Sequence, residues 1–92
     1  MSDMLETRWR ISSQAIGKSV ADETVVLHLG NGTCFGLDPI GSRLWETLSA
    51  GDPPASICAS LLEAYDVGPA QLAEDLRALM TELANNNLVE PA

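Results

Sequence analysis

The sequence contains little positive charge. Five lysine and arginine residues stand against thirteen aspartate and glutamate residues, which gives a formal net charge of −8 at pH 7. Most of these bases (Arg8, Arg10 and Lys18) lie near the N-terminus, so the chain after Lys18 is strongly acidic. A protein that binds a nucleic-acid duplex neutralises phosphates with basic side chains. The charge balance therefore argues against duplex binding.

The sequence also lacks a recognisable catalytic or metal-binding pattern. His28 is the only histidine, and it lies in the apolar stretch "TVVLHL" with no second metal ligand at a typical spacing. Ser12 and Ser13 have no residue nearby in the sequence that could act as a general base. Adjacent acids such as Glu74 and Asp75 diverge around a helix, which is typical of a solvated face. We therefore expect a protein that is not an enzyme and that binds no cofactor or metal.

Long apolar runs and targeting signals are absent as well. No segment has the length of a membrane span, and "MSDMLETRWR" has no apolar signal-peptide core, so we expect a cytoplasmic protein. Cys34 and Cys58 are then expected to be reduced thiols. A chain of 92 residues with 46% hydrophobic residues is the size of one small globular domain.

The N-terminal half reads as short strands. Residues 1–7 lack periodicity and are expected to be flexible. Arg8–Val20 predicts one or two strands, with Trp9, Ile11, Ile16 and Val20 toward a core. Asp22 and Glu23 form the expected turn, and Thr24–Leu29, "GNG" and Thr33–Leu37 follow as a hairpin. In its second strand Phe35 and Leu37 share one face, and Cys34 and Gly36 share the other.

The C-terminal half reads as three helices. Asp38 is a suitable N-cap and Pro39 a favoured first helical residue, so the first helix begins there and ends near "SAGDPP". The second is expected over residues 55–65. The third runs from residue 69 or 70 to about 86, with Leu72, Leu76, Leu79 and Leu83 as the core stripe and Met80 beside it. The fold class is therefore α+β: a three-stranded antiparallel sheet followed by three helices, as in a winged helix-turn-helix.

This fold allows two kinds of partner. As a DNA-recognition helix, the third helix would present Glu74, Asp75 and Glu82 against one base, Arg77, which disfavours phosphate contact. An open edge at Thr33–Leu37 instead favours peptide binding by strand addition. Met80 is suited to such a groove, although core packing is an equally good interpretation of it.

The stretches "DETVVLHLGNGTCFGLDPIGSRLWETLSAG" and "YDVGPAQLAEDLRALMTELANNNLVE" resemble the PqqD-like family over about residues 20–90. These are recognition domains of pathways that modify ribosomally made peptides, and the chain looks similar to the stand-alone forms found beside lasso-peptide proteases and cyclases. Three positions depart from the family pattern, which often has an aromatic residue at Cys34, a polar one at Gly36 and asparagine at Asp38.

The resemblance implies that residues 8–92 form a single PqqD-like winged-helix domain. It implies capture of the leader segment of a precursor peptide, which adds as a strand and lies along the third helix. The backbone partners would be Thr33, Cys34, Phe35, Gly36 and Leu37, and the helix wall would be drawn from Asp75, Leu76, Arg77, Leu79, Met80 and Leu83.

The expected partners are the precursor peptide and a modifying enzyme such as a leader peptidase, a cyclase or a radical enzyme. No nucleic acid or membrane is expected, and the protein is expected to be a monomer or weak dimer. A winged-helix DNA-binding regulator and a structural or oligomerisation module, self-paired through the open edge, are the alternatives.

Overall fold

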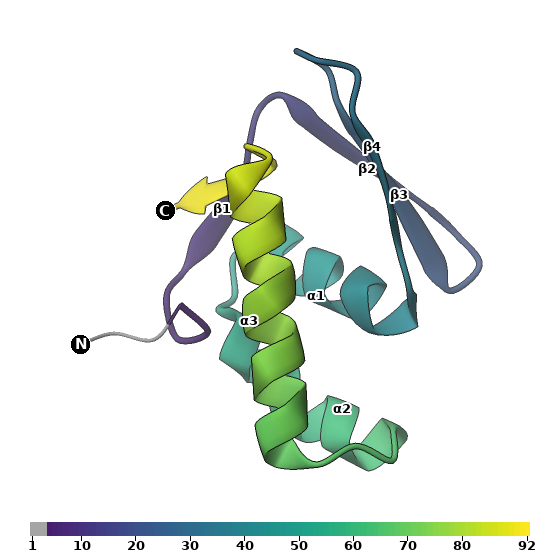
Figure 1. The fold of residues 1–92 in the computed structure, drawn as a ribbon, viewed down its shortest axis with the longest axis vertical. Helices are drawn as coiled ribbons and strands as arrows, with labels where there is room; N and C mark the ends of the chain where they lie inside the picture. The colour runs from purple at the N-terminus through teal and green to yellow at the C-terminus, as the bar shows by residue number, and fades with distance from the viewer. Residues whose placement is uncertain (1–3) are drawn as a thin grey trace.

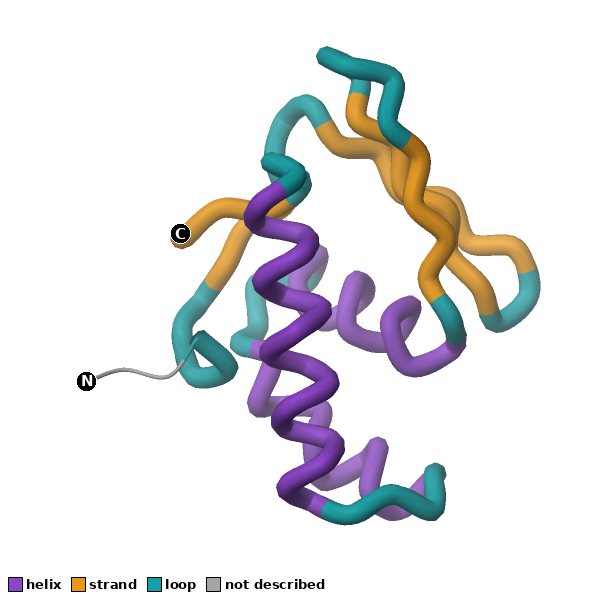
Figure 2. The backbone as a smooth tube through the Cα atoms, in the orientation of Figure 1, coloured by secondary structure: helices purple, strands orange, loops and turns teal. Residues whose placement is uncertain are grey.

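The computed structural model describes residues 4–92 as two small sheets and a set of helices (Figures 1 and 2). The larger sheet is antiparallel, with the order β2-β3-β4. Its strands are β2 (Ala15–Val20), β3 (Glu23–His28) and β4 (Cys34–Leu37). The predicted hairpin is thus confirmed, and the structure has two strands where one or two were expected over Arg8–Val20. The α+β class with three antiparallel strands and three helices is confirmed too.

On β2, the small residue Gly17 faces the helices, whereas the large residues Ile16 and Val20 face away from them. Ile16 and Val20 were expected to face the core, but 53% and 64% of their surfaces are exposed. Gly17 faces inward instead, and a Cβ atom there would overlap the indole of Trp45. Trp45, a buried residue of the first helix, therefore takes the space that the inner face of β2 leaves empty.

Replacement of Gly17 by alanine is expected to lower the free energy of unfolding by about 1–3 kcal/mol, because the new methyl group displaces the Trp45 ring. Urea denaturation measures this as a lower midpoint at an unchanged slope. Gly36→Ala is the matched control, since a Cβ atom on Gly36 meets no atom within 4 Å. Equal losses in the two variants would contradict the proposed packing.

The turn between β2 and β3 is centred on Ala21 and Asp22, one residue earlier than expected. Ala21 adopts a φ of +56°, a left-handed conformation that costs an alanine about 1–2 kcal/mol. Ala21→Gly is therefore expected to raise the free energy of unfolding by about 0.5–1 kcal/mol, after the greater flexibility of unfolded glycine is subtracted. Asn87→Gly serves as the control in the same urea titration. Asn87 has a φ of +60°, which asparagine tolerates, so a larger gain there would contradict this account.

The helical part begins at the predicted capping residue. Asp38 precedes α1 (Pro39–Ser49), and its Oδ1 accepts a hydrogen bond of 2.7 Å from the Gly41 N–H. The second predicted helix is divided into a 3₁₀ helix, η1 (Pro54–Ile57), and the short α2 (Cys58–Ala64). The long α3 (Pro69–Asn85) packs against α2 and crosses in front of α1 in Figure 1.

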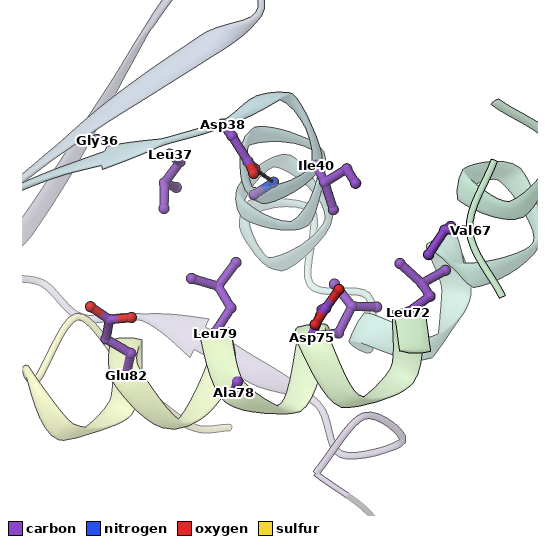
Figure 3. Close-up of a pocket in the computed structure, with 12 residues that line it drawn as sticks. Gly36, Leu37, Asp38, Ile40, Val67, Leu72, Asp75, Ala78, Leu79 and Glu82 are labelled. Atoms are coloured by element: carbon purple, nitrogen blue, oxygen red, sulfur yellow. Dashed lines mark hydrogen bonds between the residues drawn. The ribbon is translucent and has the colours of Figure 1, made fainter. Parts of the chain in front are cut away.

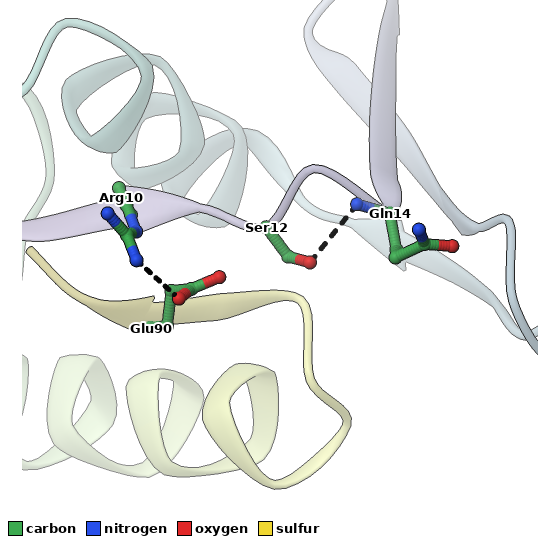
Figure 4. Close-up of polar contacts among 4 residues, drawn as sticks. All are labelled: Arg10, Ser12, Gln14 and Glu90. Carbon is green, nitrogen blue, oxygen red and sulfur yellow. Dashed lines mark hydrogen bonds and ion pairs between the residues drawn. The ribbon is translucent and has the colours of Figure 1, made fainter.

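A second sheet joins the two ends of the chain. β1 (Trp9–Ile11) pairs antiparallel with β5 (Val89–Pro91), a strand that the sequence did not predict because three residues carry too little pattern. Arg10 Nη2 lies 2.8 Å from Glu90 Oε2 across this pair (Figure 4). At the corner that leads to β2, the Gln14 N–H donates to Ser12 Oγ over 3.1 Å, which Figure 4 also shows.

The segment before β1 is part of the domain where the structure describes it. Leu5 is 4% exposed within the core, and its carbonyl accepts a hydrogen bond from the Ala55 N–H over 2.7 Å. The Trp9 indole N–H donates to the Met4 carbonyl over 2.9 Å. The structure therefore places Met4 and Leu5, which belong to the segment expected to be flexible, against the rest of the domain. Residues 1–3 lie outside the described residues.

The core joins the inner face of the sheet to the three helices. Its buried apolar residues include Val26 and Leu37 from the sheet, and Leu44, Trp45, Leu48, Leu61, Leu72, Leu76, Met80 and Leu83 from the helices. Cys34 and Cys58 are free thiols. Within residues 4–92, no helix is long and apolar enough to cross a membrane.

Candidate functional site: the groove between β4 and α3

The outer edge of β4 is open. β4 ends the order β2-β3-β4, so no strand of the described chain pairs with its far side. The His28 N–H donates to the Thr33 carbonyl over 2.8 Å, and paired residues of an antiparallel ladder alternate between bonded and non-bonded positions. Phe35 and Leu37 therefore bond to β3, whereas Cys34 and Gly36 direct their N–H and C=O groups toward the open edge.

A groove of about 420 Å³ separates this edge from α3 (Figure 3). The end of β4 and the start of α1 form one wall, and the facing side of α3 forms the other. Apolar side chains dominate the lining, which comprises Gly36, Leu37, Asp38, Ile40, Gly41, Val67, Leu72, Asp75, Leu76, Ala78, Leu79 and Glu82.

At the base of the groove, Leu79 of α3 lies close to Gly41 of α1. A Cβ atom on Gly41 would lie 3.2 Å from Leu37 Cβ and 3.4 Å from Leu79 Cδ2, so a larger residue there would press on Leu37 and contact Leu79. Leu79 is half-buried and points from α3 toward Leu37 and the start of α1 (Figure 3). The base is therefore apolar and fixed by packing, which suits a pocket for an apolar side chain.

The polar groups of the groove are carboxylates. Asp38 uses Oδ1 to cap α1, and Asp75 Oδ1 accepts a hydrogen bond of 2.8 Å from Gln71 Nε2. Glu82 lies farther along α3, on the side of Gly36 and Leu37 (Figure 3). The groove lining contains no lysine, arginine or histidine. It therefore offers hydrogen-bond acceptors and negative charge, with no basic group to balance them.

The structure brings together only some of the predicted binding residues. Gly36, Leu37, Asp75, Leu76 and Leu79 all line the groove. Cys34 and Phe35 lie on β4 and Thr33 lies just before it, but none of the three lines the groove. Arg77 is exposed on α3 outside the lining.

Two predicted wall residues are core residues. Met80 and Leu83 are 0% and 1% exposed and, unlike Leu76, do not line the groove, so the structure places them in the core rather than on the groove wall. Ala78 and Glu82 were missed, although they share a helix face with Asp75 at a spacing of three or four residues per turn. The remaining missed residues come from other elements: Asp38, Ile40, Gly41, Val67 and Leu72.

His28 has a structural role. It is buried, and its Nδ1 accepts hydrogen bonds from the Gly30 and Asn31 N–H groups at 3.1 and 3.3 Å. These bonds hold the turn between β3 and β4. The part of the chain that the structure describes contains no group of three or more histidine, cysteine or acidic residues able to hold a metal ion.

The architecture is that of a winged helix-turn-helix domain with an unpaired edge strand beside its last helix. Residues 23–89 match the family described as coenzyme PQQ synthesis protein D (PqqD). The match covers most of the chain, and the protein therefore belongs to the PqqD family. No curated protein matches the chain.

Two solved structures share the fold. TbiB1, in complex with the TbiA(beta) leader peptide, is 40% identical, with a TM-score of 0.80 over 88% of this chain and 94% of that chain. Lasso peptide synthetase B1, complexed with the leader peptide, is 23% identical, with a TM-score of 0.81 over 91% of this chain and 99% of that chain. The second likeness is one of fold alone, whereas the first extends to sequence.

Proposed function

We propose that this protein binds the leader segment of a ribosomally synthesised precursor peptide and presents it to a modifying enzyme, in the biosynthesis of a lasso peptide or a related modified peptide. The observation that carries the proposal is the open edge of β4 beside an apolar groove. The 40% identity to TbiB1, whose structure contains a leader peptide, supports it.

The leader would add to β4 as a fourth strand. Cys34 and Gly36 would exchange main-chain hydrogen bonds with it, each worth about 0.5–1.5 kcal/mol net. Main-chain bonds do not distinguish sequences, so specificity would come from side chains that enter the groove. Burial of one leucine-sized side chain against Leu79 would contribute about 1.5–3 kcal/mol.

The protein would act as an adaptor rather than as a catalyst. Holding the leader raises the effective concentration of the precursor at an enzyme that binds the same adaptor. The enzyme would be a leader peptidase, a cyclase or a radical enzyme, and the adaptor would be a cytoplasmic monomer or weak dimer. Main-chain docking leaves the rest of the precursor free to enter an active site.

The charge of α3 disfavours a DNA-binding regulator. Glu74, Asp75 and Glu82 are all exposed on this helix, where a winged-helix regulator would need bases to neutralise phosphates. Duplex binding below micromolar concentration at low salt would therefore contradict the proposed function. A stable dimer in sedimentation that binds no peptide, and that no peptide dissociates, would favour the oligomerisation alternative.

Amide hydrogen exchange tests strand addition directly. The probe is the TbiA(beta) leader peptide, followed by binders selected from a random peptide display library. A bound strand is expected to protect the Cys34 and Gly36 amides, while the Phe35 amide, already bonded to β3, changes little. Failure of every probe and every selected binder to protect the two edge amides would overturn the proposal.

A further inference from the structure

Two carboxylates of α3 flank Leu79 in the groove. Asp75 and Glu82 lie on the groove side of α3, seven residues apart, with Leu79 between them (Figure 3). Seven residues of α-helix rise about 10.5 Å. Glu82 lies toward the Gly36 and Leu37 end of the groove, whereas Asp75 lies opposite Asp38 and Ile40, with Leu72 and Val67 beyond it (Figure 3).

The protein does not neutralise this charge from within the groove. The one described hydrogen bond to Asp75 comes from the neutral side-chain amide of Gln71. Arg43, on α1, donates to Ser60 Oγ over 3.2 Å and lies outside the groove lining. A peptide that covers the groove would remove water from these carboxylates, and opposite charges on the peptide would offset that cost.

We infer that the leader segment carries lysine or arginine two residues before or after an apolar anchor, on the same face of the added strand. This inference rests on the proposed function. Side chains on one face of a strand repeat every two residues, about 6.8 Å. An anchor over Leu79 therefore places the flanking positions about 14 Å apart, and long basic side chains reach carboxylates about 10.5 Å apart.

The spacing also sets what the groove rejects. An acidic residue at either flanking position would face Asp75 or Glu82 without an intervening cation, and like charges in a partly dry groove repel. An exposed ion pair changes affinity by about two- to five-fold, so two pairs together are expected to contribute about five- to twenty-fold. Screening makes this contribution smaller at high salt.

Peptide display with paired charge variants tests the inference. A random twelve-residue library is selected against the wild-type protein, and the binders are measured against Asp75→Asn/Glu82→Gln. The control is Glu63→Gln/Glu74→Gln, which removes the same charge from exposed positions on α2 and α3 outside the groove lining. Protection of the Cys34 and Gly36 amides identifies the binders that occupy the edge.

The expected result is enrichment of lysine or arginine two residues from an apolar anchor. Binders with one such basic residue should lose about two- to five-fold in affinity with the groove pair, and binders with one on each side of the anchor about five- to twenty-fold. Both kinds should lose less than two-fold with the control pair. Equal losses of affinity with both pairs would mean that binding depends only on the net charge of the protein, which overturns the inference. Edge-protecting binders without basic enrichment would overturn it while the proposed function stands. Absence of edge-protecting binders would overturn both.

Discussion

Gly36→Pro is expected to reduce leader-peptide affinity by about 10- to 100-fold while the protein stays folded. Proline has no N–H, so the variant loses one of the donors that β4 directs toward its open edge. A peptide carbonyl buried there without a donor adds a further cost, and together these amount to about 1.5–3 kcal/mol. Proline is tolerated where the N–H of an edge strand faces away from its neighbour. Fluorescence polarisation with the TbiA(beta) leader peptide, or with a display-selected binder, gives the affinity.

Gly36→Ala distinguishes the loss of the N–H donor from the effect of adding a side chain at this position. Alanine retains the N–H, and its Cβ atom has no neighbour within 4 Å, so its affinity should stay within about two-fold of wild type. Circular dichroism melts of both variants show whether the sheet remains intact. Unchanged peptide affinity in a folded Gly36→Pro variant would exclude a main-chain ladder at β4.

The elements that frame the groove were predictable from local sequence. The hairpin turn around Gly32, which has a φ of +74°, and the Asp38–Pro39 start of α1 both depend on residues that are near each other in the chain. Alternation placed Leu37 on the inner face of β4, where it is buried. The open edge followed from the order of the strands, because a short hairpin places successive strands side by side.

The composition of the groove was less predictable, because neighbouring elements decide which helix face is buried. Leu79 and Met80 are adjacent, and either one fits the apolar stripe of α3. Gly41 admits Leu79 to the groove base, and this contact joins residues far apart in the sequence. The exposure of Ile16 has a similar cause, because it depends on Trp45 packing over Gly17 from another element.

The assignment of Leu79 to the groove and Met80 to the core leads to a second strong prediction. Leu79→Asp is expected to reduce peptide affinity by about 10- to 100-fold, because it removes the apolar base and adds a carboxylate between Asp75 and Glu82. The half-buried position of Leu79 means that the domain should still fold. Leu79→Met, which keeps an apolar side chain of similar volume, should bind peptide within about three-fold of wild type.

Met80→Asp is the contrasting variant in the same series. Met80 is 0% exposed, so an aspartate there would be buried without a partner and is expected to unfold the domain. Polarisation measures the affinity of each folded variant, and circular dichroism reports the fold. Retained peptide affinity in a folded Leu79→Asp variant would place the anchor elsewhere. A folded Met80→Asp variant that has lost peptide binding would instead place Met80 on the peptide-binding wall.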